Sequence, residues 1–327
     1  MKLLFWQHEV NEAETQRAAG IFGLGLIGQS IDQALGRRIL SKESERAYDW
    51  KDKQRRDWHW KELTAMFAEL SANGTVPRYF DVIWSAGQGG FSSTEDALAK
   101  ETVLIEEILD HCSNLQAQFP PVSVRFHFIS SAGAFFEGQT HVSCCHMPVL
   151  RRAYGAAKMD QENLIAGRTS DFHCQIYRPS SVYGFVPGGR FGLISALINN
   201  VLTNKVTRIT GSPNTLRDYV FADDIGCFIA NQVLLVPKNS ADQQMKSPMI
   251  LASGKAASMF EVIAMVEREL GRPAYLMFDK EPLNGLPMSF LPSLLPENWQ
   301  ATAFNVGVHL TAARLQSHFA NSPTSGR

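Results

Sequence analysis

The sequence lacks the features that mark nucleic-acid-binding, membrane-spanning and secreted proteins. Its 327 residues include 31 Lys or Arg and 32 Asp or Glu, so there is no basic excess to bind a phosphate backbone or an anionic membrane. No apolar run approaches the roughly 20 residues that span a bilayer. The apolar start Met1 to Trp6 breaks at Gln7, too early for a secretory signal. We expect a cytoplasmic protein with neither nucleic acid nor membrane as a partner.

Cysteine is also scarce, and its spacing argues against a disulfide framework or a zinc site. The five cysteines are an odd number and show no Cys-x-x-Cys pair. They are Cys112, Cys144, Cys145, Cys174 and Cys227. We expect reduced thiols and no bound metal, as in most cytosolic proteins.

Short apolar runs alternate with helical stretches through the first half of the chain. This alternation is typical of an α/β protein whose parallel sheet is covered by helices. The predicted strands are 19–22, 79–85, 122–129 and 173–177. After residue 178 the elements become shorter and Pro- and Gly-rich turns separate them. We therefore predict a Rossmann-type doubly wound parallel sheet with a smaller C-terminal substrate lobe.

The predicted boundary between the two parts lies at residue 178. Residues 1–178 would form the dinucleotide-binding domain, with 1–18 as an atypical N-terminal extension. Residues 179–327 would form the substrate-binding lobe and would partly interleave with the first domain.

A glycine-rich loop follows the first predicted strand and opens a helix. The pattern Gly23-x-Gly25-x-x-Gly28 in this context is typical of a dinucleotide site. Glycines let the backbone approach a pyrophosphate, and the amides of Leu26 and Ile27 lie at the positive end of the helix.

Asp49 stands 21 residues after Gly28, where an acid commonly binds the adenosine ribose hydroxyls. This position favours NAD. Nearby basic residues keep NADP open, because a 2′-phosphate needs cationic partners; they are Lys51, Lys53, Arg55 and Arg56.

Tyr154 and Lys158 are one helical turn apart, and Ser131 ends a predicted strand upstream. A free tyrosine has a pKa of about 10, and a fixed ammonium beside it favours the phenolate. A serine hydroxyl can hold the substrate oxygen while the phenolate takes its proton. These three residues are therefore the predicted catalytic set for moving a hydride between an alcohol and a nicotinamide.

With these residues in place, the sequence resembles the extended short-chain dehydrogenase/reductase family, in its NAD-dependent epimerase/dehydratase branch. The motifs occur in the family's order from about residue 20 to 315. They are the glycine loop, Trp84-Ser85-Ala86-Gly87, Ile129-Ser130-Ser131-Ala132-Gly133, Tyr154-x-x-x-Lys158, Arg178-Pro179-Ser180-Ser181-Val182-Tyr183-Gly184 and Arg217-Asp218-Tyr219-Val220-Phe221-Ala222-Asp223-Asp224.

The resemblance implies roles at the matching positions. Tyr154 would be the general acid/base, and Lys158 would hold the nicotinamide ribose. Ser131 and Ser181 would contact substrate, and Arg217 would face the diphosphate of a nucleotide-sugar. An alternative for Arg217 is a salt bridge between the lobes with Asp218 or Asp223. The remaining cofactor-binding positions are Ser85, Ala86 and Gly87, and the likeness to related enzymes implies a homodimer formed through two long helices.

Some positions depart from the family pattern. Phe22 stands where the first glycine of the loop is usual, Phe135 replaces a tyrosine, and Ser181 replaces a common asparagine. Because no Asp-Glu pair follows Ser131, dehydration is disfavoured. The sequence predicts a nucleotide-sugar epimerase. The alternatives are a reductase of a keto sugar or other carbonyl that uses NAD(P)H, and a non-catalytic dinucleotide-binding sensor or scaffold.

Overall fold

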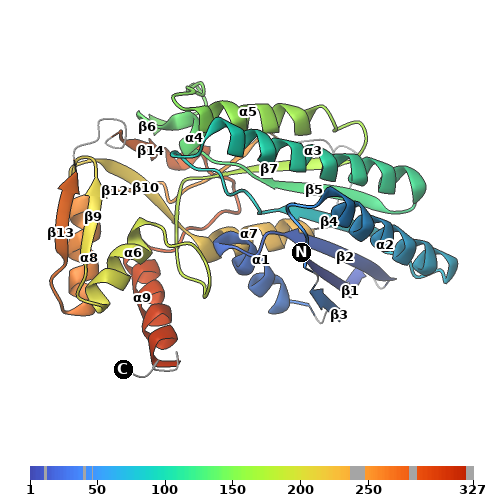
Figure 1. Cartoon of the computed structure of the whole chain (residues 1–327), viewed down its shortest axis with the longest axis horizontal. Coiled ribbons are helices and arrows are strands. Elements are labelled where there is room, and N and C mark those ends of the chain that lie inside the picture. The colour runs from blue at the N-terminus through green and yellow to red at the C-terminus, as the bar shows by residue number, and fades with distance from the viewer. Residues whose placement is uncertain (11–12, 40–41, 46, 236–246, 280–285, 322–327) are drawn as a thin grey trace.

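A seven-stranded sheet with helices on both faces forms the larger part of the structure (Figure 1). The computed structural model describes residues 1–10, 13–39, 42–45, 47–235, 247–279 and 286–321. Across the sheet the order is β11 (Met249–Leu251), β7 (His173–Pro179), β5 (Ser123–Ile129), β4 (Tyr79–Trp84), β2 (Ala13–Phe22), β1 (Lys2–Val10) and β3 (Lys42–Glu45). The strands from β11 to β2 are parallel, which confirms the predicted Rossmann-type fold.

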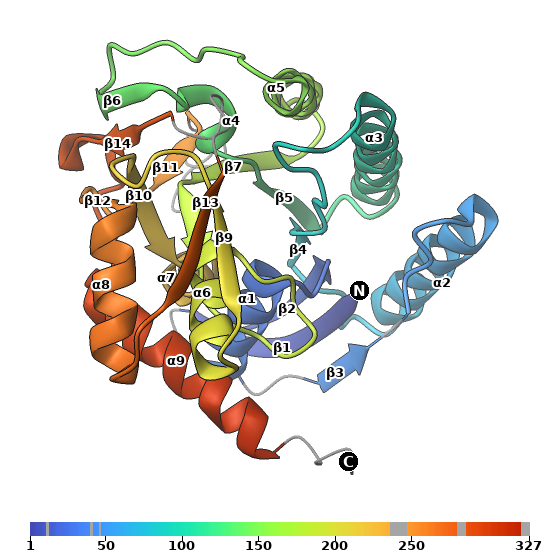
Figure 2. The same ribbon diagram turned by 60° about the vertical axis from the view of Figure 1, so that its left-hand side comes forward.

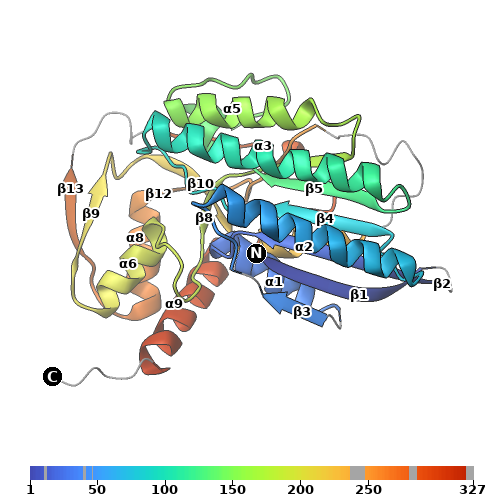
Figure 3. The same cartoon turned by 45° about the vertical axis from the view of Figure 1, so that its right-hand side comes forward.

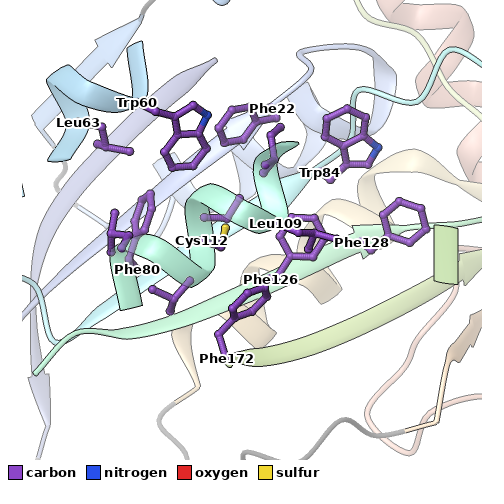
Figure 4. Packing of buried hydrophobic residues seen from close by; sticks show 14 of the residues in the cluster. Phe22, Trp60, Leu63, Phe80, Trp84, Leu109, Cys112, Phe126, Phe128 and Phe172 are labelled. Carbon is purple, nitrogen blue, oxygen red and sulfur yellow. The ribbon is translucent and has the colours of Figure 1, made fainter. Parts of the chain in front are cut away.

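Helices cover the two faces of this sheet in two groups. One face packs against α2 (Lys53–Ala72), α3 (Glu95–Gln118) and α5 (Ala153–Ala166), and the other against α1 (Leu26–Gly36) and α7 (Ala222–Leu234). Phe80 and Phe126 of the sheet pack with Leu109 and Trp60 of the helices in the first layer (Figure 4). Strand β4 is buried along its whole length because both of its faces are covered. Within the described ranges, no helix combines the length and apolar character needed to cross a bilayer.

The N-terminal segment forms part of the sheet. Strand β1 pairs antiparallel with β2 on one side and with β3 on the other. Strand β2 begins at Ala13, whereas the sequence predicted a strand only from Ala19. Residues 2–10 and 13–18, which the sequence placed in an extension, thus lie in strands. Strand β1 stands between β2 and β3 in the sheet.

The smaller lobe is built mainly from the chain after β7 (Figure 2). Its core joins three helices to short strands around Tyr219 and Phe221. The elements are β8 (Ser181–Tyr183), α6 (Leu193–Leu202), β9 (Val206–Thr210), β10 (Leu216–Phe221), β12 (Ala256–Ser258), α8 (Met259–Leu270), β13 (Tyr275–Asp279), β14 (Met288–Phe290), the 3-10 helix η3 (Pro292–Leu294) and α9 (Phe304–Asn321). From the first half, β6 (Gln139–Val142) pairs with β14, and the short helix α4 (Gly133–Phe136) precedes it. Conversely, β11 pairs with β7 in the larger sheet, and α7 packs against one face of that sheet.

A buried cluster of charges connects the larger sheet to the end of α7. Arg17 donates to the carbonyls of Val233 and Leu234 at 2.6 and 2.8 Å. Arg125 donates to Val233 at 2.5 Å and pairs with Asp81 at 2.6 Å. The guanidiniums satisfy carbonyls that a helix end leaves without partners, and they face the negative end of its dipole.

Asp81 completes the cluster, since its second oxygen lies 2.8 Å from Nε2 of His127. Burial acts to raise the pKa of Asp81, but the charge of Arg125, the hydrogen bond with His127 and the charge of Arg17 outweigh it and lower the pKa. Burial lowers the pKa of Arg17 to about 10, which still leaves it charged at neutral pH. The cluster is therefore an ionic centre within the protein interior, in which two guanidiniums share one carboxylate and the carbonyls at the end of α7.

We predict that Asp81→Ala lowers the free energy of unfolding by about 3–5 kcal/mol, because it leaves buried guanidinium charge without its counter-ion. Urea denaturation followed by circular dichroism measures this change in the free energy of unfolding. Asp96→Ala is the matched control, because Asp96 pairs with Lys100 on the surface and such pairs contribute about 0–1 kcal/mol. Equal losses for the two variants would contradict the prediction.

Candidate functional site

The predicted catalytic residues meet at the carboxyl ends of the central strands, where open α/β sheets bind ligands. Ser131 follows β5, while Tyr154 and Lys158 project from α5. All three line one cavity of about 180 Å³. Its other lining residues are Ile27, Ser85, Gly87, Gly89, Ile129, Ser130, Pro179, Ser180 and Val182.

Close packing of α5 brings Tyr154 beside Ser131. A Cβ atom on Gly155 would lie 2.6 Å from the carbonyl oxygen of Ala134, so only glycine permits this approach. The ring of Tyr154 packs edge-on against Phe91, with centroids 5.8 Å apart. On its other side the Lys158 ammonium lies 5.8 Å from the ring centroid of Tyr154.

Lys158 is buried and is held by an ion pair. Its Nζ donates to Glu101 and to Gln161, each at 2.8 Å. Glu101 comes from α3, which runs beside α5 (Figure 3). Burial acts to raise the pKa of Glu101, but the charge and hydrogen bonds of Lys158, with two backbone amides, leave the pKa lowered.

Glu101 is not among the residues that the sequence predicted for the site. It occupies a buried position of α3 at helical spacing from Leu98, Ile105 and Ile108, whereas the neighbouring Thr102 is only half-buried. An acid within an apolar helical stripe is the signal that would have identified it, because buried carboxylates need partners.

The glycine loop between β2 and α1 has the geometry of a phosphate-binding turn. Gly23 has a φ of +91°, and a Cβ there would lie 2.4 Å from Cα of Ala86. A Cβ on Gly28 would lie 1.9 Å from the Gly23 carbonyl oxygen. The Ser85 hydroxyl fastens the turn by donating to that same oxygen at 2.6 Å. Gly25, the N-cap of α1, differs: no described atom lies within 4 Å of where its Cβ would be.

The loop therefore fits a dinucleotide. Its compact side packs on the strand ends, while the open side at Gly25 exposes the helix N-terminus to an incoming pyrophosphate. The two residues after Gly25 face the space beyond: Ile27 lines the catalytic cavity and Leu26 the cavity next to it.

Asp49 lies apart from the catalytic cavity, in a hollow of about 590 Å³ between β3 and α2. Its carboxylate accepts the backbone amides of Asp52 and Lys51, each at 2.9 Å, and these bonds lower its pKa. Tyr48 packs on Phe22 and Trp50 on Trp84, so the hollow adjoins the carboxyl ends of β2 and β4.

A larger cavity continues from the catalytic one into the smaller lobe. Gly89, Ser131, Tyr154, Ser180 and Val182 line both the catalytic cavity and an intermediate one of about 560 Å³. The intermediate cavity shares Phe91, Ser181 and Arg217 with an outer cavity of about 480 Å³. The structure thus places Ser181 and Arg217 along one path that leads away from Tyr154.

Two arginines on this path share one buried acid. Arg152 pairs with Glu137 through two hydrogen bonds of 2.8 and 3.1 Å, and Arg217 approaches the same carboxylate at 3.3 Å. Both guanidiniums lie near the ring of Phe91.

The acids proposed as alternative partners of Arg217 have their own roles. Asp218 accepts from Ser180 at 2.7 Å and from the amide of Ser253 at 2.8 Å, while Asp223 pairs with Arg314. Neither acid depends on Arg217 for a partner, and Glu137 approaches Arg217 at 3.3 Å.

Comparison with known proteins confirms the resemblance. The model of the NAD dependent epimerase/dehydratase family matches residues 66–235, more than half of the chain. A protein described as a putative UDP-glucose 4-epimerase of Methanocaldococcus jannaschii is 30% identical over 131 residues. That match covers 39% of this chain and only 40% of the relative.

Solved structures of low sequence identity share the fold. The UDP-glucose 4-epimerase of Thermus thermophilus, solved with NAD, is 18% identical, with a TM-score of 0.65 over 91% of this chain and 97% of that one. The UDP-N-acetylglucosamine 4-epimerase of Bacillus cereus is 14% identical, with a TM-score of 0.64 over 90% of this chain and 94% of that one.

We predict that Gly25→Ala folds normally but weakens NAD binding at least about tenfold, because a methyl group would occupy the approach to the α1 amides. Isothermal titration calorimetry measures the affinity. Gly36→Ala, at the other end of α1 and equally free of described neighbours, is the control and should bind like the wild type. If both variants bound NAD normally, Gly25 would not lie at the pyrophosphate.

Proposed function

The chain belongs to the NAD dependent epimerase/dehydratase family, and from this premise we propose that it is a nucleotide-sugar epimerase. It would act by transient oxidation of a sugar hydroxyl followed by reduction from the other face. The observation that carries this proposal is the cavity shared by Ser131, Tyr154 and Lys158, which continues to Arg217. One ligand can therefore reach both the acid/base and a phosphate-binding guanidinium.

The relatives support the substrate class and the cofactor. Proteins of similar fold were solved with NAD together with UDP-glucose or UDP-glucuronic acid. The Methanocaldococcus relative is described as a putative UDP-glucose 4-epimerase. We infer a nucleotide-sugar substrate and NAD as the cofactor.

Each catalytic residue has a distinct task. NAD, when bound, supplies a reversible hydride acceptor, so that no external oxidant is consumed. Tyr154 takes the hydroxyl proton and later returns it, and the Ser131 hydroxyl orients the substrate oxygen. The buried ammonium of Lys158 favours the charged form of Tyr154 and holds the cofactor ribose.

Residues farther along the cavity would hold the rest of both ligands. Arg217 would face the diphosphate, because its planar fork of donors matches phosphate oxygens. Ser181 lines the intermediate cavity together with Arg217 and Tyr154 and would contact the sugar. Asp49 would bind the adenosine ribose, which favours NAD over NADP.

We also propose a homodimer formed through α3 and α5. An exposed groove of about 360 Å³ between these helices supports it, with Leu98, Ala153 and Ala157 among its lining residues. A second copy seated there would cover this small apolar surface.

The alternative is a reductase of a keto sugar or other carbonyl that uses exchangeable NAD(P)H. A spectrophotometric assay separates the two. An epimerase converts its sugar without net change in the absorbance of the reduced cofactor, whereas a reductase consumes that absorbance in proportion to product. A protein that binds NAD but turns over no nucleotide-sugar would instead be a sensor or scaffold.

We predict that Tyr154→Phe lowers kcat about 10²–10⁴-fold, because it removes the proton-transfer group. NAD binding should persist. Tyr275→Phe is the matched control: this tyrosine is 54% exposed on β13, and its loss should leave turnover unchanged. Retained turnover in Tyr154→Phe would overturn the acid/base assignment.

We predict that Arg217→Gln raises KM for the nucleotide-sugar about 10- to 100-fold and changes kcat less, because the diphosphate is bound equally in ground and transition states. Steady-state kinetics measures the effects on KM and on kcat separately. Arg208→Gln is the control, because Arg208 pairs with Asp279 on the surface of β9. An unchanged KM would leave Arg217 a purely structural partner of Glu137.

A further inference from the structure

We propose that Glu101 is a positioning residue that offsets part of the charge of Lys158 and clamps it against the loop 87–89. This inference rests on the proposed roles of Tyr154 and Lys158. It concerns the electrostatic potential at Tyr154. A lysine paired with a buried carboxylate gives a weaker positive potential there than a lysine alone.

The two oxygens of Glu101 bind two different parts of the site. Oε1 accepts from the Lys158 ammonium at 2.8 Å. Oε2 accepts the backbone amides of Gln88 and Gly89 at 2.9 and 3.0 Å. One carboxylate thus joins the lysine to the loop that leaves β4 and lines the catalytic cavity.

Glycines of this loop pack closely on the same pair. A Cβ on Gly87 would lie 3.3 Å from Oε1 of Glu101 and 3.4 Å from Nζ of Lys158. A Cβ on Gly89 would lie 2.8 Å from Leu98 and 3.3 Å from the ring of Tyr154. The loop therefore gives the Lys158 side chain little space to move away from Glu101.

Lys158 retains one donor for a ligand. An ammonium has three N–H groups, and the described protein acceptors, Glu101 and Gln161, take two of them. Gln161 is itself held by Thr102 at 3.1 Å. The third N–H would remain for the cofactor ribose, in an orientation set by the other two bonds.

The other charged groups near Tyr154 also have partners of opposite charge. Arg152 and Arg217 share Glu137 beyond the Phe91 ring. On α5, Glu162 pairs with Arg178 of β7 and accepts from Ser130. The Lys158 ammonium lies 5.8 Å from the ring centroid of Tyr154, and Glu101 is its counter-ion.

Replacing Glu101 with glutamine tests this charge balance. With the counter-ion removed, Lys158 acts on Tyr154 as a full positive charge and favours the phenolate. We expect the phenolate absorbance transition of Tyr154 to move to lower pH by about one unit in Glu101→Gln. The transition is identified as the one that Tyr154→Phe removes, so the measurement needs no substrate.

Two further variants make the test independent of how well Glu101→Gln folds. Gln161→Glu adds a second carboxylate at Lys158 and should move the transition to higher pH. The double variant Glu101→Gln/Gln161→Glu exchanges the two side chains around Lys158, and we expect it to restore the wild-type midpoint. A residue that only supported the fold would not give shifts of opposite sign followed by restoration.

Glu107→Gln is the matched control. Glu107 lies on α3 like Glu101, but it pairs with Arg56 of α2 at 2.8 Å, away from the cavity. It should leave the midpoint unchanged. Unmoved midpoints in both Glu101→Gln and Gln161→Glu would overturn the inference. If the midpoints shifted as expected but no nucleotide-sugar turned over, the proposed epimerase function would fail while the role of Glu101 stood.

Discussion

The buried ionic centre of Arg17, Asp81 and Arg125 fixes how the two parts of the protein meet. It joins β2, β4 and β5 to the last carbonyls of α7. Because α7 begins at Ala222, directly after β10 ends at Phe221, holding one end of the helix also limits where β10 can lie. Charged groups in a protein interior are stabilised only by matched partners, so a shifted packing would leave them unpaired. Helix α7 thus links this ionic centre to β10, the strand that carries Arg217.

The same principle recurs at the site, where cations share buried acids. Glu137 serves Arg152 and Arg217, and Glu101 serves Lys158. In each case the carboxylate also orients its partner, because the hydrogen bonds are directional. Ion pairing thus keeps the guanidiniums and the ammonium in place before any ligand arrives. Such preorganisation removes part of the entropy cost of binding and of catalysis.

Sequence patterns could predict the parallel strands, and they singled out three residues that line one cavity, because both depend on local information. The sequence of strand β4 is an apolar run, and Tyr154 and Lys158 are one helical turn apart. The contribution of residues 2–10 to the sheet was not predictable, since their pairing with β2 places an antiparallel strand where the sequence suggested no element. Glu101 was missed because its partner Lys158 is distant in sequence and is brought close only by the packing of α3 on α5. Pairings across the fold, such as Arg217 with Glu137, carry no local signature.

The antiparallel pair β1 and β2 has a consequence for how the chain acquires its structure. It is the strand pairing of the large sheet whose partners are adjacent in sequence, Val10 opposite Ala13, while Arg17 must wait for Tyr79 to pair on its other edge. Local pairings form within microseconds, and distant ones are slower because long loops must close first. During synthesis the first strand to emerge can thus protect one edge of β2 long before β4 exists. An unpaired edge is a template for aggregation, and β1 keeps this edge of β2 covered in the folded sheet as well.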